Sequence, residues 1–136
     1  MNVIYFAASP SLDPGIHDGI CRHLAEYGKV ETKCLNQPHV LVADVTHEDT
    51  NAGSYVGENI ERNSSRSPDD KTRILCLSKP PHGEFFQRMS RLWGPALRES
   101  ALSLEEYSSL EEAIKKIDDF FRNRTPRNPR NTFPLI

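Results

Sequence analysis

Apolar runs and amphipathic segments alternate along the chain. Residues 2–8, 39–45 and 72–78 are nearly continuous apolar runs rich in Val, Ile and Leu, a pattern typical of strands buried on both faces of a parallel sheet. Residues 29–35 alternate enough to form a further strand, and residues 99–104 predict a short edge strand. The pattern therefore predicts about five strands.

Apolar residues at helical spacing fill the intervals between these strands. Residues 16–28 carry them at steps of four, and residues 109–121 carry a stripe at i, i+3, i+4 and i+7. Residues 57–63 predict a short helix, and residues 83–93 predict another one with an apolar face. Strands that alternate with helices predict an α/β fold: a single-domain, doubly wound parallel sheet of the flavodoxin or Rossmann type, with helices on both faces.

The length of 136 residues suits one domain. We assign it to residues 1–122 and expect residues 123–136, rich in Pro, Asn and Arg, to form an irregular tail. A net charge of −2 gives no general attraction to nucleic acid or to anionic lipid. Residues 1–8 lack the pattern of a signal peptide and no run is long enough to span a membrane, so we expect an intracellular protein, cytoplasmic or nuclear.

Cysteine and histidine spacing gives no metal motif. The three cysteines, Cys21, Cys34 and Cys76, lie in predicted helix or strand segments, which favours buried free thiols over a disulfide or a zinc site. The sequence predicts neither a metal nor a cofactor.

The topology predicts where a ligand binds. In doubly wound sheets, ligands lie at the carboxyl ends of the strands, near the point where the strand order reverses. The loops at residues 9–13, 46–58 and 79–84 should therefore surround one pocket.

Three motifs occur in an order that suggests a family. The chain carries IYFAASPS at the first loop, HVLVADVT before a turn with Gly and Ser followed by Glu, and then TRILCLSKPPHG. This combination resembles the nucleoside 2-deoxyribosyltransferase superfamily, and within it the 2'-deoxynucleoside 5'-monophosphate N-hydrolases. The likeness extends from Val3 to about Phe121.

The resemblance implies an enzyme that hydrolyses the N-glycosidic bond of nucleoside 5'-monophosphates, releasing free base and sugar phosphate. A carboxylate at the start of the helix after the third strand attacks the anomeric carbon, whose positive charge in the transition state it also stabilises. Glu58 is the matching candidate if a residue or two is deleted before it, and Tyr5 matches the tyrosine that holds the carboxylate in place. An ungapped match places Tyr55 at the position of the carboxylate instead. A surface carboxylate in a first helical turn is the structural alternative for Glu58.

The same resemblance suggests a phosphate site and an acid. Ser9 and Ser11 of the first loop, with Gly53 and Ser54 of the turn before Glu58, are the candidate phosphate-binding residues. Ser11 stands where the family has an arginine, so a cation that would pair with the phosphate is missing. The segment that carries the family's acid is shorter here, and Asp44, or else Asp49, is the candidate replacement.

Two other functions remain open. A catalytically inactive member would keep the fold as a nucleotide-binding or assembly module, a possibility favoured by Ser11, by the shortened segment and by Tyr55. A receiver-like domain would be phosphorylated on Asp44, although it would lack the paired acids that hold magnesium. The resemblance also implies a homodimer, while RNA binding through the tail is disfavoured by its lack of interspersed aromatic residues.

Overall fold

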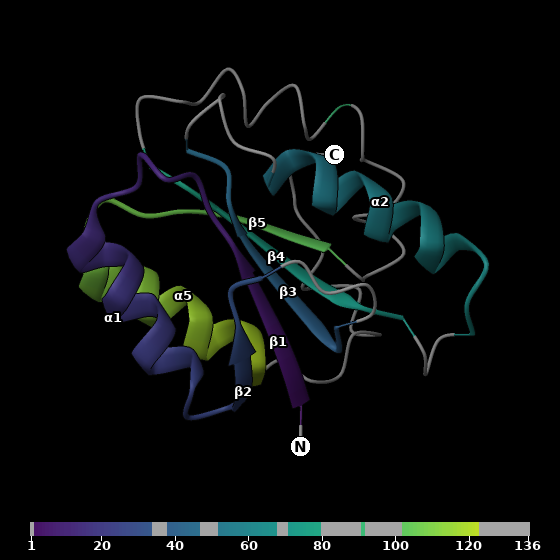
Figure 1. The fold of residues 1–136 in the computed structure, drawn as a ribbon, viewed down its shortest axis with the longest axis horizontal. Helices are drawn as coiled ribbons and strands as arrows, with labels where there is room; N and C mark the ends of the chain where they lie inside the picture. Colours follow the sequence, from purple (N-terminus) through teal and green to yellow (C-terminus); the bar gives the residue numbers. More distant parts are fainter. Residues whose placement is uncertain are drawn as a thin grey trace.

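The computed structural model describes residues 2–33, 38–46, 52–67, 71–79, 91 and 102–122. Within these ranges, five parallel strands form one sheet in the order β2-β1-β3-β4-β5. The strands are β1 (Asn2–Ala7), β2 (Gly28–Glu31), β3 (Val40–Asp44), β4 (Arg73–Ser78) and β5 (Leu102–Glu106), and the helices are α1 (Pro14–Leu24), α2 (Ala52–Ser64) and α5 (Leu110–Arg122). The predicted doubly wound α/β sheet is confirmed (Figure 1).

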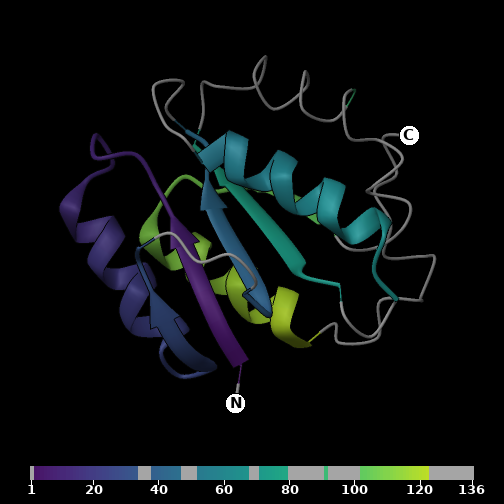
Figure 2. The same cartoon turned by 45° about the vertical axis from the view of Figure 1, so that its right-hand side comes forward.

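Helices cover both faces of the sheet. α1 and α5 lie on one face and α2 lies on the other, as Figures 1 and 2 both show. Within β3, Val40 and Val42 join the core beneath α1 and α5, whereas Leu41 and Ala43 join the core beneath α2. Every residue of β3 is buried, which explains why its sequence is continuously apolar rather than alternating.

A glycine lies at the close contact between α1 and α5. A Cβ atom placed on Gly19 would lie 2.4 Å from the Leu110 Cδ2 atom of α5. Sequence periodicity predicts an apolar stripe along α5. Four side chains of that stripe are buried in the core shared with α1 and the sheet: Ala113, Ile117, Phe120 and Phe121. The two helices therefore close the core on this face of the sheet.

Four elements differ from their predicted bounds. α1 ends at Leu24 rather than at residue 28, because Gly28 opens β2, and β5 extends to Glu106 rather than ending at residue 104. β2 ends at Glu31 rather than at residue 35, because Thr32 and Lys33 are exposed and unpaired with β1. α2 begins at Ala52 rather than at residue 57, so Gly53 and Tyr55 belong to its first turn rather than to a loop. The predicted helix at residues 83–93, apart from Arg91, and the tail at 123–136 lie outside the described residues.

The strand order fixes the switch point. β1 lies between β2 and β3, so the chain crosses from β1 to β2 on one side and then runs from β2 back past β1 to β3 on the other side. The carboxyl ends of β1 and β3 are therefore the position where this kind of sheet binds ligands. Figure 2 shows the start of α2 beside the carboxyl end of β3.

Candidate functional site

Buried polar side chains gather at the carboxyl edge of the sheet. Ser9 follows β1, Asp44 ends β3, Thr46 follows it, and Ser78 ends β4; each is at most 5 % exposed. Buried polar groups require hydrogen-bond partners, so the contacts of these residues define what this edge can do.

Two tyrosines contact each other on the α2 face. Tyr5 of β1 is 4 % exposed, and its ring meets the ring of Tyr55 edge-on, with 5.3 Å between the centroids and 75° between the planes. Both rings pack against the apolar core beneath α2. Tyr55 of α2 thus lies against Tyr5 and places a phenol at the position that the ungapped match gives to the carboxylate.

Glu58 lies one turn further along α2. Three residues advance a helix by about 4.5 Å, and because α2 begins beside the carboxyl end of β3, this step leads away from that edge. The Glu58 side chain is 56 % exposed and forms an ion pair with Arg62 at 3.8 Å between Oε2 and Nη2. Glu58 therefore faces solvent, in an arrangement typical of a surface ion pair on a helix.

Asp44 and Tyr5 project from opposite faces of the sheet. Asp44 continues the alternation of Val40 and Val42 toward α1 and α5, whereas Tyr5 belongs to the core beneath α2. The structure thus separates the candidate acid from the tyrosine pair by the thickness of the sheet.

Asp44 takes part in a buried hydrogen-bond network. Its Oδ2 atom accepts a hydrogen bond from the Tyr107 hydroxyl, and its Oδ1 atom accepts one from the Thr46 backbone N–H at 2.9 Å. Burial and the negative charge of Asp44 both raise the pKa of Tyr107, so the phenol stays protonated and donates. Since Asp44 is 1 % exposed, this arrangement disfavours the receiver-like alternative, which needs a phosphoryl donor to reach the carboxylate.

Tyr107 was not among the candidate residues. It follows directly after the edge strand β5 and bonds through its backbone N–H to the Ser78 carbonyl at 3.0 Å. An aromatic residue immediately after a strand was the signal available in the sequence, but its partner lies 63 positions away.

The first loop is organised around Ser9. The Ser11 backbone N–H donates to the Ser9 hydroxyl oxygen at 3.0 Å, and the Leu12 N–H donates to the Ser9 carbonyl at 3.0 Å. Ser9 is buried, whereas Ser11 is exposed. Ser9 thus shapes the turn after β1, and the Ser11 side chain stands at its surface.

Gly53 and Ser54 occupy the first turn of α2. The first backbone N–H groups of a helix lack partners within the helix, and they point toward its start. The sequence-predicted residues Tyr5, Ser9, Gly53 and Ser54 thus come from segments that meet at the carboxyl edge.

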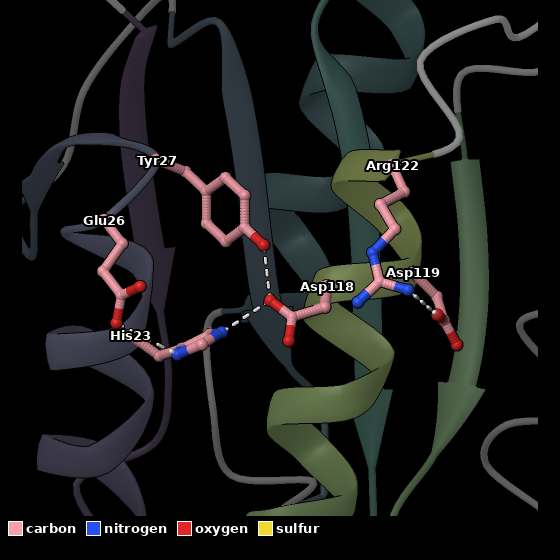
Figure 3. Close-up of polar contacts among 6 residues, drawn as sticks. All are labelled: His23, Glu26, Tyr27, Asp118, Asp119 and Arg122. Carbon is pink, nitrogen blue, oxygen red and sulfur yellow. Dashed lines mark hydrogen bonds and ion pairs between the residues drawn. The ribbon is translucent and has the colours of Figure 1, made fainter.

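A second polar cluster joins α1 to α5, away from this edge. The Asp118 Oδ1 atom accepts a hydrogen bond from the Tyr27 hydroxyl and contacts His23 Nε2 at 2.6 Å (Figure 3). The hydrogen bond to Asp118 raises the pKa of Tyr27 to about 12, and hydrogen bonds from Tyr27 and His23 lower the pKa of Asp118. Tyr27 immediately precedes β2, whose first residues pair with the start of β1, so this cluster lies near the amino edge of the sheet.

The lowered pKa of Asp118 predicts a pH-dependent contribution to stability. We expect Asp118→Asn to lower the free energy of unfolding by about 1 kcal/mol at pH 7, a value reduced by solvent screening because the carboxylate is 24 % exposed. An ionised Asp118 stabilises the fold above its unfolded pKa of about 3.9, and this contribution is lost as the pH falls through the lower folded pKa. Urea unfolding from pH 7 to pH 3 measures the difference, which should shrink below about pH 4. A difference that stays constant over this range would contradict the assignment.

Cys21 and Cys76 are free thiols, and Cys34 lies outside the described residues. Burial raises the pKa of both described thiols, most strongly for Cys76, which makes them poor nucleophiles. Across the described ranges, no group of three or more His, Cys, Asp or Glu side chains has the arrangement of a metal site. In the same part of the chain, no helix combines the length and the apolar character needed to cross a membrane.

No protein-family model matches the chain, and no curated protein matches it either.

Proposed function

We propose that this chain is a nucleotide-binding module with the fold of the nucleoside 2-deoxyribosyltransferases, which holds a nucleoside 5'-monophosphate at the carboxyl edge of its sheet without cleaving it. The family assignment rests on the three sequence motifs and their order. The location rests on the switch point between β1 and β3, where open α/β sheets bind their ligands.

The contact between Tyr5 and Tyr55 is the observation that carries the proposal. Cleavage of a glycosidic bond through a covalent intermediate needs an ionised carboxylate at the anomeric carbon. From α2, the phenol of Tyr55 meets Tyr5 at the position that the ungapped match gives to the carboxylate, and a phenol cannot supply that charge. The partly exposed Tyr55 ring instead offers an apolar face with a polar end, suited to contact a base or a sugar.

Hydrolysis through Glu58 is the competing prediction from the sequence, and the experiment below tests it against the proposal. Its carboxylate faces solvent beside Arg62, and Asp44, the candidate acid, projects from the other face of the sheet with both oxygens hydrogen-bonded. A hydrolase would need both groups to reach one glycosidic bond.

The proposal predicts binding without turnover. Purified protein incubated with the four deoxynucleoside and four ribonucleoside 5'-monophosphates should release no free base above the uncatalysed rate, measured by chromatography. At least one of these nucleotides should stabilise the protein against unfolding, by about 2.7 kcal/mol at a concentration of 100 times its Kd.

Two variants test which residues of α2 contribute to nucleotide binding. Tyr55→Ala should weaken binding, whereas Glu58→Gln, one turn away and exposed, should leave the Kd unchanged. Release of base that Glu58→Gln abolishes would reject the proposal in favour of the hydrolase. Absence of both binding and release would reject any nucleotide function.

A homodimer in the cytoplasm or nucleus belongs to the same proposal. Nucleoside monophosphates are intracellular metabolites, and the sequence of residues 83–93 predicts a helix with an apolar face, a pattern that suits a dimer contact. Light scattering of the purified protein measures the mass, and a monomer at micromolar concentration would argue against the dimer.

A further inference from the structure

We infer that Tyr107 is a positioning residue for the carboxyl edge: its hydroxyl holds the Asp44 carboxylate, and through Asp44 it fixes Thr46 and Lys79, the residues that follow β3 and β4. The inference rests on the proposed function for its ligand, a nucleoside 5'-monophosphate. It gives a role to the buried carboxylate that the proposed function does not otherwise use.

The hydrogen bonds connect the ends of three neighbouring strands. Tyr107, directly after β5, donates to Asp44 at the end of β3. Asp44 accepts from the backbone N–H of Thr46, and the Thr46 hydroxyl oxygen accepts from the backbone N–H of Lys79 at 3.1 Å. Asp44 and Thr46 therefore tie the first residues after β3 and β4 to the residue after β5.

The two backbone groups that this network holds belong to segments that the sequence assigns to the ligand pocket. Thr46 begins the connection from β3 to α2, whose first turn carries Tyr55, and Lys79 begins the connection that follows β4. The network residues Asp44, Thr46 and Tyr107 are at most 5 % exposed. They are thus placed to act on a ligand through the backbone rather than by touching it.

The chemistry makes this network rigid. A buried carboxylate is costly unless it is hydrogen-bonded, and a charged acceptor forms stronger hydrogen bonds than a neutral one. The Asp44 carboxylate joins the Tyr107 hydroxyl to the Thr46 backbone N–H, so loss of the hydroxyl disturbs Asp44 and Thr46 together. Greater mobility at Thr46 should in turn weaken the hydrogen bond from the Lys79 backbone N–H to the Thr46 hydroxyl oxygen.

Tyr107→Phe removes the hydroxyl and keeps the ring. Tyr27→Phe is a matched control, because it removes a hydroxyl that also donates to a carboxylate, that of Asp118, near the other edge of the sheet. Amide hydrogen exchange by NMR measures how readily the backbone opens at Thr46 and Lys79, and it needs no ligand. Titration calorimetry with the tightest-binding deoxynucleoside 5'-monophosphate of the panel measures the Kd of the ligand site.

In Tyr107→Phe we expect the Thr46 and Lys79 amides to exchange about tenfold faster, with amides of β1 unchanged, and the nucleotide Kd to rise about tenfold. Tyr27→Phe should change neither readout. Thr46→Val, which preserves shape and leaves the Asp44 carboxylate paired with Tyr107, gives a second test: it should accelerate exchange at Lys79 and weaken the nucleotide.

Unchanged exchange at Thr46 and Lys79 in both edge variants would overturn the inference, whatever the protein binds. Faster exchange with an unchanged nucleotide Kd would overturn it as well, because the network would then be structural only. If the wild-type protein binds no nucleotide, the proposed function fails, while faster exchange confined to the edge still supports the role of Tyr107 in holding these segments.

Discussion

Replacing Ile117 with alanine is expected to lower the free energy of unfolding by about 2–5 kcal/mol. Ile117 is fully buried in the core where α5 meets α1 and the sheet. The substitution removes apolar surface and leaves a cavity, since close-packed neighbours relax only in part. For a domain of this size, such a loss is a large share of the total stability.

Urea unfolding followed by circular dichroism measures this change, and the slope with denaturant should stay constant. Ile114→Ala is the matched control on the same helix, because Ile114 is only half-buried. Its cost should be clearly smaller. Equal losses for the two variants would show that α5 is not packed through the Ile117 face.

Replacing Asn63 with alanine is expected to cost about 2–4 kcal/mol, because two buried backbone groups lose their partner. The Asn63 side-chain Nδ2 donates to the Thr72 carbonyl at 2.9 Å, and its Oδ1 accepts from the Thr72 backbone N–H at 2.8 Å. Asn63 thereby fastens the end of α2 to the residue before β4. The Thr72 hydroxyl also donates to the Pro38 carbonyl, so the loss should extend toward β3.

Asn59 supplies a control of the same residue type, one turn earlier in α2. Asn59 is 2 % exposed, its Nδ2 donates to the Tyr55 carbonyl, and its buried Oδ1 atom has no hydrogen-bond partner among the described residues. Because an unpaired buried oxygen already destabilises the fold, Asn59→Ala should cost less than about 1 kcal/mol. Thermal unfolding of both variants compares them, and a greater loss for Asn59→Ala would refute the role given to Asn63.

The elements that the sequence predicts best are those whose burial is uniform along their length. β3 is buried on both faces and α5 on one stripe, so each carries the periodicity of its own environment. The start of α2 is not predicted from the sequence, because Gly53, Ser54 and Gly57 are poor helix formers. There, burial of Val56 in the core beneath α2 overrides local preference.

The candidate site likewise has a part that the sequence predicts and a part that it does not. Topology alone brings the loop after β1 and the start of α2 to one edge, so Tyr5, Ser9 and the first turn of α2 could be placed from the sequence. The face on which a side chain projects depends on strand register, which separates Asp44 from Tyr5. The bond between Asp44 and Tyr107 joins positions that no local pattern relates.

The contact between α1 and α5 sets an order of events during protein synthesis. Ile20 and Leu24 of α1 share a core with Ile117 and Phe121 of α5, yet α5 is the last described element in the chain. On the ribosome, the apolar face of α1 emerges long before its cover. Because every strand pair of the described sheet is parallel and needs a long crossover, no hairpin between these strands shelters that face early. The nascent chain therefore stays open to chaperones until residue 122 has left the exit tunnel, and it gains its full core in one late step.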